Sequence, residues 1–283
     1  MNRILNFHKM HGIGNDFIVV HAGFGPGDNV YPDARQAVAL CDRRFGVGAD
    51  GVLIIGPSKT ADFKVTIYNS DGSTAEMCGN GIRCCALYVQ RNGLSDKPAA
   101  VFETGAGPVS VESLGSERFR VCMGAPILDA DKIPTRQPSG RVLLHELSLD
   151  RETVSLTAVS MGNPHAVLFT DDPTDNMVLR LGPSIERHAF FPRKTNVEFV
   201  KVLSKNEITM RVWERGCGET LACGTGACAA VVAGVLVGQT GGEVAVHLPG
   251  GDLHVTWDGG EESPVFLTGP AVESFRGSVD LAP

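Results

Sequence analysis

Short apolar runs and one polar cap define the first elements of the chain. Residues 17–20 and 51–55 are apolar and rich in β-branched side chains, which predicts two buried strands. Asp33 precedes a mixed segment that extends to Arg44, and an aspartate at this point predicts the N-cap of a helix. The first half of the chain therefore predicts a mixture of helix and strand.

A second helix is predicted after Cys78. Apolar residues recur there at helical spacing until Gly93, a typical C-terminal stop. We expect Arg83 and Arg91 to form its polar face.

The helix predicted after Cys223 has a different pattern. Residues 227–237 are apolar on nearly every face, and Gly238 is expected to end the helix. The segment is too short to cross a bilayer. Protein must therefore enclose it on all sides.

The two cysteines open the same short motif, Cys-Gly-x-Gly, 145 residues apart (223 − 78). With this offset, the strand-like run 63–68 falls on 208–213, and the turn residues Gly14 and Asn15 match Gly162 and Asn163 at an offset of 148. A repeat of this length predicts an internal duplication. The expected fold class is α/β (α+β), with two pseudo-symmetric domains, each a curved sheet or barrel wrapped around a central helix.

The repeat also predicts the domain limits. Residues 1–124 form an N-terminal half with Cys78, and residues 125–269 form a C-terminal half with Cys223. Residues 125–150 are polar and contain three prolines, so the boundary is expected at their start. The tail, residues 270–283, is expected to return to the first domain.

Composition narrows the class of partner. The chain has 283 residues, 43% of them hydrophobic, and a net charge of −7 without a basic cluster. This balance disfavours binding to nucleic acid, which needs a positive surface. No apolar run of about 18 residues or signal-peptide pattern is present, so no membrane association and a cytoplasmic location are expected. The expected partner is a small molecule.

The eight cysteines predict neither a disulfide framework nor a metal site. Their density is low for the chain length, and no Cys-x-x-Cys pair occurs. Reduced thiols, no metal and no cofactor are the expectation. A thiol redox protein that uses Cys78 and Cys223 remains an alternative.

A cysteine at the start of a helix has a distinctive chemistry. Unpaired N–H groups and the helix dipole are expected to lower the pKa of each thiol and to attract an anion. The neighbouring glycines let the backbone approach such a ligand closely. If the halves face each other about a pseudo-two-fold axis, one thiol can remove a proton and the other can deliver one, as in a racemase.

Five further motifs are long and specific. They are residues 12–17 (GIGNDF), 69–73 (NSDGS), 77–81 (MCGNG), 161–165 (MGNPH) and 214–226 (ERGCGETLACGTG). Together they resemble the diaminopimelate epimerase family over nearly the whole chain. The resemblance implies two α/β barrels, usually in a homodimer, and cofactor-independent interconversion of LL- and meso-diaminopimelate for lysine and peptidoglycan precursors.

The resemblance also assigns roles to individual residues. Cys78 is expected to act as the base toward the LL isomer and Cys223 as the acid, with His165 in a supporting role. The residues expected to bind substrate are Asn15, Asn69, Gly79, Asn80, Asn163, Asn196, Glu214, Arg215, Gly224 and Thr225. Among them, Arg215 and Glu214 suit the distal carboxylate and ammonium of diaminopimelate.

One position departs from the family pattern, because Gly51 stands where some members have a glutamine that reaches the site. Proline racemase and hydroxyproline epimerase relatives, which share the paired cysteines, are a further alternative. Their substrates have a single carboxylate and need no distal Glu-Arg pair, so Glu214 and Arg215 argue against them. A binding module without turnover is separated from these enzymes only by an assay.

Overall fold

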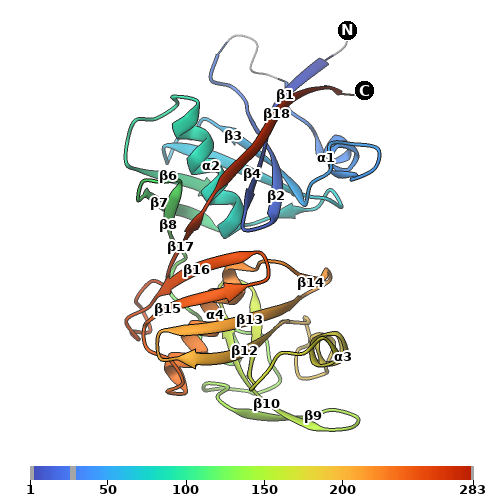
Figure 1. The fold of residues 1–283 in the computed structure, drawn as a ribbon, viewed down its shortest axis with the longest axis vertical. Coiled ribbons are helices and arrows are strands. Elements are labelled where there is room, and N and C mark those ends of the chain that lie inside the picture. Colours follow the sequence, from blue (N-terminus) through green and yellow to red (C-terminus); the bar gives the residue numbers. More distant parts are fainter. Residues whose placement is uncertain (1–2, 26–29, 282–283) are drawn as a thin grey trace. The chain divides into compact units, whose positions relative to one another are not determined.

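The computed structural model describes residues 3–25 and 30–281. The chain divides into two compact units, of which unit 1 comprises Met1–Val121 and Gly269–Pro283 and unit 2 comprises Cys122–Thr268. The limits expected from the sequence are residues 124 and 269. Because the C-terminal strand pairs with the first strand of the chain, the tail lies in unit 1 (Figure 1).

Unit 1 is one curved sheet with two helices (Figure 1). Its elements are β1 (Arg3–Gly12), β2 (Asn15–His21), α1 (Ala34–Cys41), β3 (Gly51–Gly56), β4 (Phe63–Asn69), β5 (Thr74–Ala75), α2 (Gly79–Arg91), β6 (Ala99–Thr104), β7 (Gly107–Ser113), β8 (Arg118–Cys122) and β18 (Val272–Leu281). The strand order is β18-β1-β2-β3-β4-β6-β7-β8, and β5 pairs with the end of β4. The pairs β2–β3 and β4–β6 are parallel.

Unit 2 repeats this plan. Its elements are β9 (His145–Ser148), β10 (Thr153–Ser160), β11 (Pro164–Phe169), α3 (Asp175–Glu186), β12 (Asn196–Ser204), β13 (Glu207–Glu214), β14 (Gly218–Thr220), α4 (Gly224–Leu236), β15 (Glu243–Leu248), β16 (Gly251–Thr256) and β17 (Phe266–Pro270). The strand order is β9-β10-β11-β12-β13-β15-β16-β17, with β14 paired to β13. The parallel pairs, β11–β12 and β13–β15, are the equivalents of those in unit 1.

The duplication predicted from the sequence is confirmed at the level of single residues. Helices α2 and α4 both have 13 residues, and their first and last residues differ by 145. The register of the short strand is also kept, because Ile67 pairs with Ala75 and Val212 pairs with Thr220. One ancestral unit therefore accounts for both halves.

The two central helices are enclosed by their own sheets. Helix α2 contacts β1, β2, β3, β7 and β18, and α4 contacts β10, β11, β12 and β16. The nearly continuous burial of α4 agrees with its apolar sequence. Within residues 3–25 and 30–281, no helix is long and apolar enough to span a membrane.

Helix α2 differs from the expectation in one respect. Arg83 was expected on a polar face, but it is fully buried. Its guanidinium donates to the carbonyl oxygens of Pro270 (3.0 Å) and Gly79 (3.2 Å) and to Asn80 Oδ1 (2.8 Å). These three acceptors compensate the buried charge and tie the first turn of α2 to Pro270, which also belongs to unit 1.

The outer helices α1 and α3 cover the opposite faces of the two sheets. Asp33 caps α1 as predicted, since its carboxylate accepts the N–H of Gln36 at 2.8 Å. The predicted end at Arg44 is wrong, because α1 ends at Cys41. The carboxylate of Asp42 accepts the N–H groups of Arg44 and Phe45 at 2.7 and 2.8 Å, which replaces the helix by a turn.

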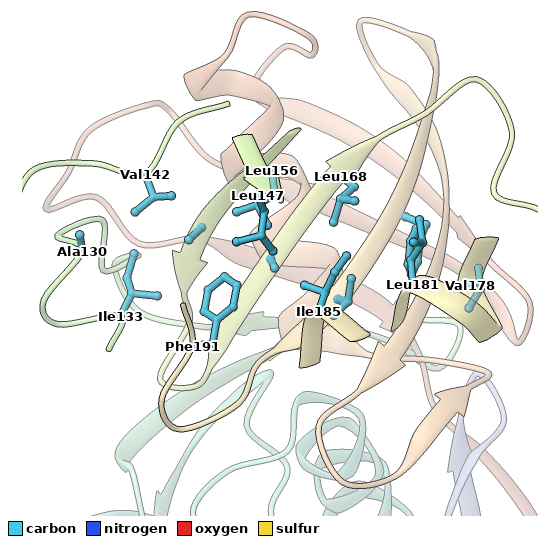
Figure 2. Close-up of a cluster of buried hydrophobic side chains, with 14 residues drawn as sticks. Ala130, Ile133, Val142, Leu147, Leu156, Leu168, Val178, Leu181, Ile185 and Phe191 are labelled. Atoms are coloured by element: carbon cyan, nitrogen blue, oxygen red, sulfur yellow. The ribbon is translucent and has the colours of Figure 1, made fainter. Parts of the chain in front are cut away.

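In unit 2, the strand alternation separates an apolar face from a polar one. Figure 2 shows the apolar side chains between α3, the sheet and the segment before β9. Val197 and Phe199 of β12 point into this core, so Asn196 and Glu198 point to the other face, toward α4. The same alternation on β11 places Ala166 and Leu168 in the core and His165 on the α4 side.

The proline-containing segment 125–150 is part of unit 2. Ile133, Val142 and Leu147 from this segment are fully or almost fully buried in the core drawn in Figure 2. Ile127 forms a β-bridge with Ser160. The prolines therefore shape a packed loop within one unit.

The contact between α3 and β13 predicts a steric effect at Gly182. A Cβ atom there would lie 2.6 Å from Cγ of the Trp213 side chain. Alanine normally stabilises a helix interior relative to glycine by about 1 kcal/mol. Here we expect Gly182→Ala to lower the free energy of unfolding by about 1–3 kcal/mol, because the methyl group overpacks the core. Urea denaturation measures this, with the exposed Ser184→Ala of α3 as the control; a Gly182→Ala protein more stable than its parent would contradict the packing.

Candidate functional site

Each central helix begins with the sulfur atom of a cysteine as its cap. The N–H of Gly81 donates to Cys78 Sγ at 3.4 Å, and the N–H of Gly226 donates to Cys223 Sγ at 3.3 Å. Both cysteines have extended backbone conformations. The two thiols therefore occupy the same local geometry at the N-terminus of a buried helix.

The first two N–H groups of each helix, which precede the one bound to sulfur, have no acceptor within the helix. They belong to Gly79 and Asn80 in α2 and to Gly224 and Thr225 in α4. The first turn of neither helix contains an acidic side chain that would offset the positive end of the dipole. Both helix starts can therefore accept an anion such as a carboxylate.

Cys78 is surrounded by amide side chains. Its Sγ donates to Asn15 Oδ1 at 3.7 Å, and Asn80 Nδ2 donates to the same oxygen at 3.2 Å. Asn15 is fixed in turn, since its Nδ2 donates to Asp50 Oδ2 at 2.8 Å. The structure thus brings the predicted residues Asn15 and Asn80 to Cys78.

Cys223 lies at the end of a chain of hydrogen bonds. Its Sγ is 3.5 Å from Thr225 Oγ1, which accepts a hydrogen bond from Asn163 Nδ2 at 3.3 Å. Asn163 Oδ1 lies 2.9 Å from His165 Nε2, and His165 Nδ1 lies 2.7 Å from Glu198 Oε1. The structure brings three predicted residues, Asn163, His165 and Thr225, together with Cys223.

The expected low thiol pKa is wrong for Cys223. Burial raises the pKa of Cys223 well above its ordinary value, and the nearby carboxylates of Glu214 and Glu198 raise it further. The hydrogen bonds from Thr225 and the N–H of Gly226 act in the other direction but are outweighed. Burial also raises the pKa of Glu214. Cys223 therefore holds its proton at neutral pH.

The repeat places different residues around Cys78. With the offset of 145, Leu53 is the equivalent of Glu198, and Asn69 is the equivalent of Glu214. A Cβ at Gly81 would meet the Leu53 side chain at 3.2 Å, whereas one at Gly226 would meet Glu198 Oε1 at 2.8 Å. The two caps share one backbone geometry, but the two carboxylates beside Cys223 have uncharged equivalents in unit 1.

Asn196 and a buried carboxylate hold the loop after β13. Asn196 Oδ1 accepts the N–H of Arg215 at 2.8 Å. Glu186 accepts the N–H of Gly216 at 3.1 Å and the indole N–H of Trp213 at 2.9 Å. These bonds fix the backbone on both sides of Arg215, whose guanidinium remains exposed.

Two further positions in unit 1 make local contacts: Asn69, which is expected to bind substrate, and Gly51, where the chain departs from the family pattern. Asn69 lies at the end of β4, where its Nδ2 donates to Ser73 Oγ at 2.9 Å. At Gly51, a Cβ would lie 2.5 Å from the carbonyl oxygen of Tyr68. A side chain at position 51 would therefore require the backbone to shift.

Two buried carboxylates in these surroundings, Glu186 and Glu198, were not expected from the sequence. Glu198 has a detectable signal, since it is the only charged residue in the apolar run 197–200. A lone charge in a buried strand usually has a specific partner. Within residues 3–25 and 30–281, no three His, Cys, Asp or Glu side chains are grouped as a metal site.

The sequence matches one family throughout both units. The family model for diaminopimelate epimerase matches residues 7–128 and 157–273. The diaminopimelate epimerase of Moorella thermoacetica is 48% identical over 283 residues, which cover 98% of this chain and 100% of that protein. The diaminopimelate epimerase of Desulforudis audaxviator is 50% identical over 278 residues, with coverages of 96% and 98%.

Solved structures with the same fold are more distant in sequence. A hydroxyproline epimerase from Agrobacterium vitis is 14% identical, with a TM-score of 0.71 and coverages of 99% of this chain and 94% of that chain. A probable proline racemase from Agrobacterium radiobacter is 18% identical, with a TM-score of 0.72 and the same coverages. At this identity the similarity concerns the fold alone, and it confirms the two-domain α+β architecture.

The different surroundings of the two thiols predict a difference in their reactivity. Because the thiolate is the nucleophile, iodoacetamide at pH 8 should label the half-buried Cys78 at least tenfold faster than the buried Cys223. Peptide mass spectrometry over time measures both rates. The exposed Cys217 serves as the internal control for reagent activity. Equal rates at Cys78 and Cys223 would contradict the assignment of a retained proton to Cys223.

Proposed function

Because this chain belongs to the diaminopimelate epimerase family, we propose that it interconverts LL- and meso-diaminopimelate by a two-base mechanism without a cofactor. One observation supports this proposal most directly. Cysteines cap the two central helices at equivalent positions of the repeat, and the two carboxylates beside Cys223 have the uncharged equivalents Leu53 and Asn69 in unit 1. Such a pair can hold one thiolate and one thiol at the same pH.

The proposed reaction moves one proton at each face of the α-carbon. Starting from the LL isomer, the thiolate of Cys78 removes the α-proton, and the electron pair of the broken C–H bond passes into the adjacent carboxylate. The thiol of Cys223 then donates its proton to the opposite face. The product has the inverted configuration, Cys78 is a thiol and Cys223 a thiolate, and the reverse reaction exchanges the roles. The raised pKa of Cys223 makes it the acid in the first direction.

The charge that develops on the carboxylate needs donors that are already in place. We assign this role to the N–H groups of Gly79 and Asn80 on one side and of Gly224 and Thr225 on the other. Each pair lies at the positive end of a helix. Asn15 is placed to orient Cys78 through its hydrogen bond to the sulfur.

The distal end of diaminopimelate is a second amino acid and needs its own partners. Arg215 can bind the distal carboxylate with two parallel hydrogen bonds. Glu214 and Asn69 can accept from the distal ammonium, and Asn163 and Asn196 complete the polar surroundings. Proline has no such second group, so an enzyme for proline would have no use for a distal Glu-Arg pair. Turnover of diaminopimelate but not of proline is therefore the discriminating result.

We further propose that the enzyme supplies precursors of lysine and peptidoglycan in the cytoplasm and acts as a homodimer. Strand β18 supports the dimer, since among the described residues it pairs only with β1 and leaves its other edge open. Phe275 of β18 and Ile4 of β1 are 48% and 58% exposed. Sedimentation at micromolar concentration checks the assembly, and a single species of monomer mass would refute it.

The decisive experiment follows hydrogen exchange with and without each thiol. In deuterated water, LL-diaminopimelate should give meso product that contains solvent deuterium at the α-carbon, while recovered substrate contains less label at early times. Cys78→Ala and Cys223→Ala should each lower the epimerisation rate by at least about 10³-fold, because one base cannot serve both faces. Proton NMR and mass spectrometry measure both quantities.

Cys217→Ala is the matched control, because Cys217 is exposed and lies in the loop that also contains Arg215. It should retain the parent rate. If either Cys78→Ala or Cys223→Ala epimerised at close to the parent rate, a mechanism with a single base would have to replace the paired one.

A further inference from the structure

Beyond the paired cysteines, unit 2 contains a carboxylate that the proposed reaction does not use directly. Glu198 is completely buried, and its Oε1 lies 2.7 Å from His165 Nδ1. We propose that Glu198 is a positioning residue: it fixes the His165 ring and, through Asn163 and Thr225, the orientation of the Cys223 thiol. This inference rests on the proposed epimerase function.

The hydrogen bonds form one continuous chain from Glu198 to the sulfur. Both ring nitrogens of His165 face oxygen atoms, Nδ1 facing Glu198 and Nε2 facing Asn163 Oδ1. With its oxygen bound to the ring, Asn163 turns its NH₂ group toward Thr225 Oγ1, which lies 3.5 Å from Cys223 Sγ. If the His165 ring could rotate, the Asn163 side chain could turn as well. The Thr225 hydroxyl beside the Cys223 thiol would then lose the fixed hydrogen bond from Asn163.

The alternation of side chains along β12 fixes the direction in which Glu198 points. It points from β12 toward α4, on the same side as His165 of the neighbouring parallel strand β11. The turn that begins α4 passes directly over it, since a Cβ at Gly226 would lie 2.8 Å from Glu198 Oε1 and 3.2 Å from Cys223 Sγ. Glycine at 226 permits this close contact between the carboxylate and the thiol turn.

The repeat indicates that folding alone does not require this charge. The equivalents of His165 and Glu198 in unit 1 are Phe17 at an offset of 148 and Leu53 at 145, and both are buried. Glu198 Oε2 has no hydrogen-bond partner among the described residues, which makes the buried carboxylate costly. Unit 1 has an apolar residue, Leu53, at the equivalent position. A carboxylate that destabilises unit 2 at this position is therefore expected to serve the chemistry.

The first test compares isosteric variants. Glu198→Gln keeps the shape of the side chain and removes its charge. We expect kcat for LL-diaminopimelate to fall by about tenfold, because a neutral amide holds the ring with a weaker hydrogen bond than a carboxylate does, while KM changes less than about threefold. Glu207→Gln is the matched control, because it breaks an exposed carboxylate–histidine pair with His247 in the same unit. A Glu198→Gln enzyme with kcat within twofold of the parent would overturn the proposal.

The second test concerns stability. The double variant His165→Phe/Glu198→Leu gives unit 2 the apolar pair that unit 1 has at these positions. We expect a Tm equal to or above that of the parent, because well-packed apolar residues often replace a buried carboxylate and its partner without loss. A Tm lowered by more than about 5 °C would mean that the pair is structural, and it would overturn the proposal.

A third measurement does not depend on turnover. In ¹⁵N-labelled parent protein, His165 should give an Nδ1–H proton signal that is shifted downfield by its bond to the carboxylate, and Glu198→Gln should move or remove it. If the parent enzyme failed to epimerise diaminopimelate, the proposed function would fail while this signal still tested the contact. An unchanged signal in Glu198→Gln would overturn the positioning role even in a fully active enzyme.

Discussion

A helix enclosed by its own sheet can meet a small ligand only at an end, and in both units the N-terminal end begins with a cysteine. Because α4 is enclosed, its apolar side chains are buried on every side. The first N–H groups of the helix have no acceptor within the helix. The same constraint places the sulfur, the glycine backbone and the positive end of the dipole within one turn. Everything else in each unit, from the outer helix to the edge strand, holds that turn in place.

In each unit, a buried charged residue supports the first turn of the central helix, but the sign of its charge differs between the units. In unit 1, the buried guanidinium of Arg83 binds the carbonyl of Gly79 and the amide of Asn80, so a cation supports the start of α2. In unit 2, Cys228 takes the equivalent position in the helix, and the carboxylate of Glu198 lies under the turn instead. A buried guanidinium thus supports one turn and a buried carboxylate lies under the other, although the two backbones are similar.

The sequence predicts the parts of this architecture that depend on periodicity. The offset of 145 predicts the equivalent helices, and Asp33 predicts a cap with the geometry that is observed. Side-chain partners between strands are harder to predict, because they depend on which face of the sheet each residue occupies. The burial of Arg83 depends in part on an acceptor that is distant in sequence, the carbonyl of Pro270, and the pKa of Cys223 depends on carboxylates from two other strands.

The divergence of the two halves follows from what a two-base reaction requires. Two thiols in identical surroundings would have the same proton affinity, so a single proton on the pair would be shared equally between the two sulfur atoms. Only a state with one proton can remove hydrogen on one face and deliver it on the other. Burial beside Glu214 and Glu198 favours the proton on Cys223, whereas Asn69 and Leu53 at the equivalent positions in unit 1 introduce no negative charge. The duplication thus gives the two thiols the same local geometry, and the carboxylates beside Cys223 bias the shared proton toward that thiol.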